Sequence, residues 1–402
     1  MLTERREIKR LIFFFSLVYM ASYITRTNLG AVISEVEAST GISRSALSAA
    51  VTANFIAYGV GQVISGFLGD RISPKRLVIF GLILTTAMNL LFPLCADATL
   101  MTVVWCINGF AQSMLWPPIV KILTVVLSDD DFKDGCTTMS LYASSGTVVI
   151  YLIAPLLIFL FSYRSVFVFS AALGAVAILI WARFAPNVEN YKKTEKNLEN
   201  TAPKYNIFTP LLLLILLAIT LQGMLRDGVT TWMPSYISDT YSLGSEISIL
   251  SGVLLPLFSI ICMKVTAQIY KKRIRNPLTL AGIIFLLGAV AALGLALLGG
   301  RVAILSVLLS ALLTGSMYGV NLMLISMVPG FFKGYRNLGL ITGVLNFATY
   351  VGSAVSTYGI ALISEGYGWD TTITIWFGIA ALGTALCLIL ARPFSNKFIK
   401  KV

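Results

Sequence analysis

The sequence has no histidine and few charged residues, which make up 12% of its 402 positions. The absence of histidine removes the commonest proton relay and the commonest ligand of transition metals. The five cysteines are scattered without paired spacing, so neither a disulfide framework nor a metal site is expected. Nucleophile elbows and phosphate-cradling glycine loops are also missing. We therefore expect a protein that is not an enzyme and that binds no cofactor.

Apolar residues fill the chain instead. Hydrophobic residues make up 57% of it, and its mean hydropathy is +0.85. Such values lie far outside those of soluble domains and indicate a protein that has the lipid bilayer as its solvent. A helix needs about 20 apolar residues to cross a bilayer, so the chain is long enough for about twelve crossings. In a membrane protein the positions of the positive charges behind the formal charge of +12 indicate the topology, and we expect no nucleic-acid partner.

Two groups of six apolar segments are separated by a polar stretch that is rich in Lys, Asn and Glu. We predict an all-α membrane protein of 12 transmembrane helices in two pseudo-symmetric halves. The halves are residues 1–186 and 207–402, and a cytoplasmic linker at 187–206 joins them. The expected helical segments are 11–34, 46–69, 76–94, 100–127, 137–160, 164–184, 207–238, 246–270, 278–298, 302–329, 337–363 and 369–391.

The distribution of positive charge supports this count of helices. With the N-terminus inside, 23 of the 30 Lys and Arg residues fall in cytoplasmic segments and 3 fall in outer loops. Positively charged loops resist translocation, so this asymmetry indicates the orientation. The charged N-terminus runs into an apolar segment without a small-residue cleavage site, so we expect the first helix to be retained. We predict a multi-pass protein of the cell membrane with both termini in the cytoplasm.

Two arginines, Arg26 and Arg226, lie well inside the first apolar segment of each half. A guanidinium at mid-membrane costs between about 2.5 and more than 10 kcal/mol, so such a residue indicates a function. Arginine keeps its charge, and its planar fork matches two oxygens of a phosphate or carboxylate. Together the two arginines predict a site for a small anion, and two such forks suit a dianion. The structural alternative is that each guanidinium pairs with a buried carboxylate or with helical carbonyls.

Asp227 is the one acid that the sequence places deep in an apolar segment. Consecutive residues on a helix point about 100° apart, so we expect Asp227 to be a poor partner for Arg226. Two hypotheses for Asp227 remain open. In the first, Asp227 carries a proton that is coupled to transport. In the second, it is a structural counter-ion to a buried cation. Candidates for that cation are Lys264, Lys121 and Arg26.

The loop after the second segment has the sequence Gly-Phe-Leu-Gly-Asp-Arg-Ile-Ser-Pro-Lys-Arg at residues 66–76. Its spacing and position resemble the signature loop of the major facilitator superfamily. The resemblance implies the major facilitator fold and a cytoplasmic gate, in which Asp70 caps or pairs across the two halves. The alternative is a plain charged turn. The residues assigned to the gate are Asp70, Arg71, Lys75 and Arg76.

A closer resemblance extends over nearly the whole chain and is carried by short motifs. The run at 23–29, the Trp-Pro-Pro motif at 116–118 and the sequence at 226–236 resemble the organophosphate:phosphate antiporters. That family includes glycerol-3-phosphate and hexose-6-phosphate exchangers. The resemblance implies that Arg26 and Arg226 clasp the phosphate of the substrate or inorganic phosphate.

Other candidate substrate contacts come from neighbouring positions. Tyr23 lies three residues before Arg26 and so shares its helical face. The sequence departs from the resemblance at Gln62, where well-known members carry lysine, and at Ser144, where some carry histidine. The residues assigned to substrate binding, besides the two arginines, are Tyr23, Tyr58, Gln62, Ser144 and Trp116.

Three functions compete. We expect the exchange of a small organic phosphate or related anion for inorganic phosphate by alternating access, carried out by a monomer in the bilayer. The alternative is proton-coupled symport of an organic carboxylate or other anion, with Asp227 as the proton carrier. A membrane sensor that binds the same anion is the third class, which a long cytoplasmic domain would favour. The only polar segment of any length is the linker at 187–206.

Overall fold

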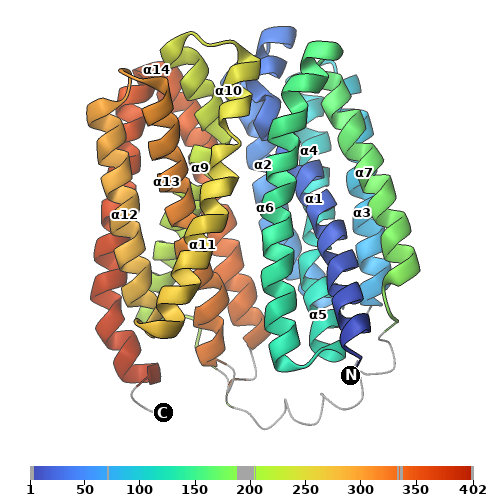
Figure 1. Ribbon diagram of the computed structural model, residues 1–402, viewed down its shortest axis with the longest axis vertical. Coiled ribbons are helices and arrows are strands. Elements are labelled where there is room, and N and C mark those ends of the chain that lie inside the picture. Colours follow the sequence, from blue (N-terminus) through green and yellow to red (C-terminus); the bar gives the residue numbers. More distant parts are fainter. Residues whose placement is uncertain are drawn as a thin grey trace. The chain divides into compact units, whose positions relative to one another are not determined.

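The structure is a computed structural model that describes residues 4–69, 72–187, 203, 205–332, 335 and 338–399. The residues in these ranges are almost all helical, and no strand occurs among them. Figure 1 shows long helices lying side by side within each half of the chain. The predicted all-α architecture is therefore confirmed.

Helices long and apolar enough to cross a membrane occur eleven times in the described residues. The first half contains α1 (Arg5–Thr40), α2 (Arg44–Gly69), α3 (Pro74–Leu91), η1 (Phe92–Leu94), α4 (Ala98–Ser113), α5 (Trp116–Val126), α6 (Asp129–Leu160) and α7 (Tyr163–Phe184). The second half contains α9 (Pro210–Tyr241), α10 (Ser245–Ser251), α11 (Leu254–Lys272), α12 (Pro277–Leu298), α13 (Ala303–Asn321), η3 (Leu322–Met327), η4 (Val328–Phe332), α14 (Leu338–Phe394) and η5 (Ser395–Ile399).

The helix α14 accounts for the difference between eleven and twelve. It is 57 residues long, about 85 Å at 1.5 Å per residue, which is far more than one crossing requires. Gly368 interrupts it with φ 79° and ψ 176°, a conformation that glycine adopts without steric cost. The chain bends there, between the two segments expected at 337–363 and 369–391. The two parts of α14 thus correspond to the last two predicted helices.

The fourth predicted segment, 100–127, is not one continuous helix. It breaks after α4, and α5 begins again at Trp116 with two prolines in its first turn. Proline lacks an N–H and is tolerated at the start of a helix, where that group has no partner in the helix. The Trp-Pro-Pro motif therefore restarts the helix inside the span.

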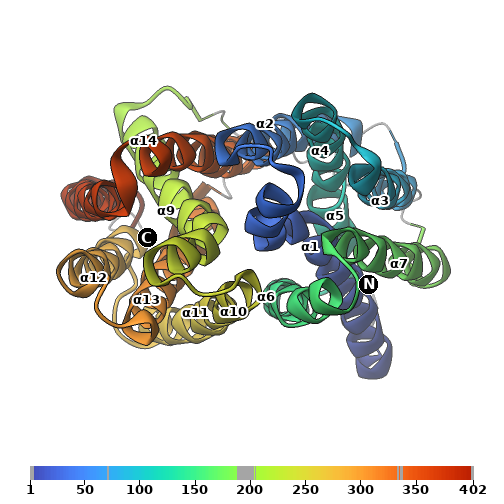
Figure 2. The ribbon, with the colours of Figure 1, turned by 90° about the horizontal axis from the view of Figure 1, so that it is seen from above.

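The chain divides into two compact units, residues 1–200 and 201–402. Within the first, α1 packs against α6 and α7, α2 against α4, and α3 against α7. Within the second, α9 packs against α14, α11 against α13, and α12 against α14. Figure 2 shows the helices of each half seen nearly end-on. The same order of pairings thus recurs in the two halves. The predicted linker at 187–206 falls largely outside the described residues.

Two glycines bring α9 and α14 into backbone contact. A Cβ atom added at Gly223 would collide with the carbonyl oxygen of Thr349, and one added at Gly352 would collide with that of Thr220. The Thr220 hydroxyl also donates to the carbonyl oxygen of Ala348 across this contact, at 3.2 Å. Small residues allow such close packing of membrane helices, where van der Waals contact replaces the hydrophobic effect.

Replacing Gly352 with alanine is expected to lower the free energy of unfolding by about 1–3 kcal/mol, because the added methyl group must push the two helices apart. Gly343 lies in the same helix with open space at its Cβ position, and Gly343→Ala should leave stability unchanged or raise it by up to about 1 kcal/mol. The unfolding midpoints of the purified variants in detergent measure the difference. Equal midpoints would show that the contact between α9 and α14 is not tight.

Candidate functional site

Arg26, in the middle of α1, lies over two tyrosine rings. Its guanidinium carbon is 4.3 Å from the ring centre of Tyr23 and 4.9 Å from that of Tyr58 on α2. Cations are attracted to the negative face of an aromatic ring at these distances. The sequence predicted that Tyr23 shares a face with Arg26, and Tyr58 joins them as a buried side chain from the neighbouring helix. The two rings attract the guanidinium and help to fix its position.

The other candidates from the first half lie on α5, α2 and α6. Trp116 packs on Tyr19 with ring centres 4.9 Å apart, and Tyr19 packs on Tyr23 at 5.2 Å. Trp116 therefore supports Tyr23 through Tyr19. Gln62 is buried one helical turn after Tyr58 on α2. Ser144 is buried in α6, which packs against α1.

Beside Arg26 lies a buried polar network that sequence analysis missed. Asn28 on α1 donates to Asn89 on α3 at 2.7 Å and to Ser170 on α7 at 3.0 Å. Asn89 in turn donates to the Thr25 carbonyl oxygen at 3.0 Å. Fully satisfied buried networks fix the position of the elements that they join. This one holds the turn of α1 that carries Arg26.

Two further amides reach the same turn of α1 from α4. Asn108 donates to the Thr25 carbonyl oxygen at 3.2 Å, and Gln112 donates to the Thr25 hydroxyl at 2.8 Å. Gln112 also donates to the Thr85 hydroxyl of α3 at 2.8 Å, and that hydroxyl donates to Asn108. Isolated Asn, Gln and Thr residues in apolar segments have no characteristic spacing. A sequence pattern gave no signal for this network.

In the second half, Arg226 on α9 forms an ion pair with Asp227. Its Nε and Nη2 atoms donate to the two carboxylate oxygens at 2.7 and 2.5 Å, and both side chains are nearly buried, with exposures of 11% and 13%. The prediction that Asp227 is a poor partner for Arg226 is wrong, and the structural alternative, in which the guanidinium pairs with a buried carboxylate, applies to Arg226. The Cα–Cβ bonds do diverge, but the long arginine stem bends its head group back to the carboxylate.

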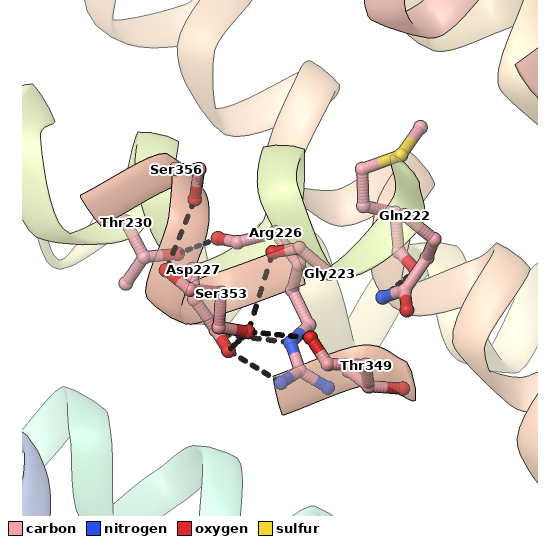
Figure 3. A network of polar contacts seen from close by, with 9 residues as sticks. Gln222, Gly223, Arg226, Asp227, Thr230, Thr349, Ser353 and Ser356 are labelled. Carbon is pink, nitrogen blue, oxygen red and sulfur yellow. Dashed lines mark hydrogen bonds and ion pairs between the residues drawn. The ribbon is translucent and has the colours of Figure 1, made fainter. Parts of the chain in front are cut away.

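Residues from α14 and α13 complete this group. The Ser353 hydroxyl donates to Asp227 at 2.5 Å, and the close contact of α9 and α14 brings it there. Figure 3 shows the contacts of this carboxylate with Arg226 and Ser353. The guanidinium carbon of Arg226 lies 5.6 Å from the ring centre of Tyr318 and 5.8 Å from that of Tyr350. Tyrosine rings thus flank the membrane arginine in both halves.

The predicted gate is described only in part, because Asp70 and Arg71 lie outside the described residues. The Nζ atom of Lys75 donates to the Ala185 carbonyl oxygen at 2.6 Å, just after the last residue of α7. The indole N–H of Trp181 donates back to the Lys75 carbonyl oxygen at 3.0 Å. Lys75 therefore caps α7 in this structure, and Arg76 is exposed.

Comparison with known proteins gives relatives over nearly the whole chain. A family model described as the Major Facilitator Superfamily matches residues 15–357. The chain is 25% identical to the glycerol-3-phosphate transporter of Bacillus subtilis, over 88% of this chain and 85% of that protein. It is 22% identical to the membrane sensor protein UhpC of Salmonella typhimurium, over 94% of this chain and 89% of that protein. These relatives confirm the resemblance to the organophosphate:phosphate antiporters.

Solved structures match the fold at low sequence identity. A bacterial homologue of the human lysosomal transporter Spinster, in an inward-facing and unoccupied conformation, matches with a TM-score of 0.80 and 14% identity over 99% of both chains. A peptide transporter in complex with sulfate matches with a TM-score of 0.73 and 15% identity, over 97% of this chain and 95% of that one. These matches confirm the predicted major facilitator fold.

Replacing Asn89 with leucine, which has a similar volume, removes one acceptor for Asn28 and a donor to the Thr25 carbonyl. We expect the free energy of unfolding to fall by about 1–3 kcal/mol for each polar group left unsatisfied. Unfolding midpoints of the purified variant and of the unmodified protein measure this loss.

The matched control is Thr86→Val on the same helix, because the Thr86 hydroxyl donates to the Leu82 carbonyl of its own helix. This change should alter stability by less than about 0.5 kcal/mol. If Asn89→Leu and Thr86→Val lower the stability equally, the network does not stabilise the turn that carries Arg26.

Proposed function

Because the chain belongs to the major facilitator superfamily, we propose that it exchanges a small organic phosphate or related anion for inorganic phosphate by alternating access. It is a multi-pass membrane transporter and not an enzyme. The observation that carries the proposal is an arginine in the first membrane helix of each half, flanked by tyrosine rings. Arg26 is half-buried and Arg226 is nearly buried. We expect the protein to act as a monomer with both termini in the cytoplasm.

The two arginines supply the chemistry that phosphate recognition needs. A guanidinium donates two parallel hydrogen bonds to the oxygens of a phosphate and keeps its charge at any physiological pH. Tyr23 and Tyr58 orient Arg26, and Tyr318 and Tyr350 flank Arg226. In the proposed mechanism both arginines contact the anion. An anion shifts the equilibrium between inward-open and outward-open states by its difference in affinity for them.

Relatives support phosphate as the shared part of the substrate. The Bacillus subtilis relative is named a glycerol-3-phosphate transporter, and a protein named a probable hexose phosphate transport protein in Chlamydia trachomatis is 30% identical over 29% of this chain and 25% of its own length. Those two names differ in the organic part of the substrate, so we propose only the phosphate group as part of the substrate of this chain.

The test of exchange is counterflow in liposomes. Purified protein is reconstituted into liposomes that are loaded with inorganic phosphate, and uptake of radiolabelled phosphate is measured without a proton gradient. We expect uptake that requires internal phosphate and that external organic phosphates inhibit. Absence of counterflow, with uptake appearing only when a pH gradient is imposed, would instead support proton-coupled symport.

A specific observation favours symport as the second candidate, since Asp227 contacts a proposed substrate arginine and offers a place for a proton. Asp227→Asn separates the two functions. Exchange predicts that the variant retains counterflow, whereas symport predicts the loss of uptake driven by a pH gradient. The similarity to a protein named a membrane sensor adds a third outcome, which is phosphate binding without either mode of transport.

Arg26→Lys and Arg226→Lys should each reduce phosphate counterflow by about tenfold or more, because lysine retains the charge but loses the two-pronged fork. Arg164→Lys is the matched control. Arg164 is exposed at the start of α7 and lies 5.8 Å from the ring centre of Tyr163, so it repeats the contact between an arginine and a tyrosine away from the proposed site. Comparable losses in all three variants would contradict a specific role for Arg26 and Arg226.

A further inference from the structure

The ion pair between Arg226 and Asp227 occupies the same part of the guanidinium that an anion uses. Asp227 accepts from Nε at 2.7 Å and from Nη2 at 2.5 Å, which is the two-pronged arrangement of a bound carboxylate or phosphate. A guanidinium has five N–H donors, so three donors of Arg226 are not used by this carboxylate. An anion that reaches Arg226 must therefore displace Asp227 or bind beside it.

The position of Asp227 is built by two helices. Ser353 on α14 is fully buried, and its hydroxyl lies 2.5 Å from Asp227 Oδ2. Ser353 is also within hydrogen-bond distance of the carbonyl oxygens of Thr349 at 3.0 Å and Gly223 at 3.4 Å. A hydroxyl has one proton, and the carboxylate is its nearest acceptor. The backbone contact of α9 and α14 keeps Ser353 in place, and Ser353 and Arg226 both contact the carboxylate oxygen Oδ2 (Figure 3).

The carboxylate of Asp227 changes the net charge that an anion meets at Arg226. With Asp227 ionised, the pair with Arg226 has no net charge, although the guanidinium still offers directed N–H donors. Tyr318 and Tyr350 flank the guanidinium with their aromatic rings. A singly charged anion can use the donors without strong repulsion from Asp227. The second charge of a dianion meets repulsion from the carboxylate and no compensating net positive charge from this pair.

We propose that Asp227 is the specificity-determining residue for substrate charge, which makes the protein select the singly charged form of its tetrahedral anion. The proposal rests on the proposed function, since it assumes that a phosphate-like anion reaches Arg226. Ser353 is the positioning residue, because it orients the carboxylate and need not touch the anion. The two arginines alone predict a site that suits a dianion, and the carboxylate reverses that preference.

The test compares two probes of nearly the same shape at pH 8. Methyl phosphate is doubly charged there, because phosphate monoesters lose their second proton with a pKa of about 6, and methyl sulfate is singly charged. Dissociation constants for purified full-length protein come from the rise of the unfolding midpoint with probe concentration. We expect the unmodified protein to bind methyl sulfate at least as tightly as methyl phosphate.

Asp227→Asn should tighten methyl phosphate binding by about tenfold or more and change methyl sulfate binding by less than about threefold, because only the dianion suffers from the carboxylate. Asp239→Asn is the matched control on the same helix. Asp239 accepts from the Trp369 indole N–H at 3.0 Å, and its loss should leave the ratio of the two dissociation constants unchanged. An unchanged ratio in Asp227→Asn, or equal weakening of both probes, would overturn the proposal.

Ser353→Ala gives a second measurement that does not require the Asp227 variant to fold. It frees the carboxylate from its hydroxyl partner, so the preference for methyl sulfate should shrink by about two- to threefold. The same change in an Asp227→Asn background should have no effect on the ratio. A ratio that stays constant in Ser353→Ala contradicts the positioning role. If neither probe raises the midpoint of any variant, the proposed function itself is wrong, which is a result distinct from an unchanged ratio.

Discussion

A guanidinium inside a membrane-spanning helix must be surrounded by groups that replace water, and each half of the chain meets this requirement differently. Around Arg26 the described neighbours include the faces of Tyr23 and Tyr58, which attract the cation. Around Arg226 the first neighbour is a carboxylate, which cancels the charge. The halves are alike in helix order and pairing. In the second half Asp227 gives α9, the helix that corresponds to α1, a carboxylate that pairs with its arginine.

Packing and electrostatics are linked in the second half. Gly223 and Gly352 let the backbones of α9 and α14 touch, and this contact brings the Ser353 hydroxyl to Asp227. Larger residues at either glycine would separate the helices, and the carboxylate would lose its hydroxyl partner. In the first half, the amides of Asn89 and Gln112 hold the turn of α1 instead. Each arginine thus depends on a feature of helix packing that lies beyond its own contacts, and both features are buried.

Hydropathy was sufficient to locate the helices, because a membrane imposes a length and a composition on each crossing. It could not show the restart of the helix at Trp116 or the bend at Gly368, which depend on local backbone geometry. The contact between Arg226 and Asp227 escaped prediction for another reason. The rule that consecutive helical residues point about 100° apart concerns the direction of their Cα–Cβ bonds. The position of the guanidinium depends in addition on four flexible side-chain torsions. Ser353 was likewise invisible, since nothing in the sequence indicates which serine of α14 faces α9.

The ion pair also bears on the choice between exchange and symport. In a strict exchanger the empty protein changes state slowly, and one physical cause is that uncompensated positive charges must be desolvated without an anion. A carboxylate that already neutralises Arg226 lowers this cost in the empty protein. On the proposed function, the empty carrier then returns more readily than one with two uncompensated arginines, and exchange is correspondingly less obligatory. On these proposals, a single acid next to Arg226 affects both which charge form of the anion binds and how tightly outward and inward movement are coupled.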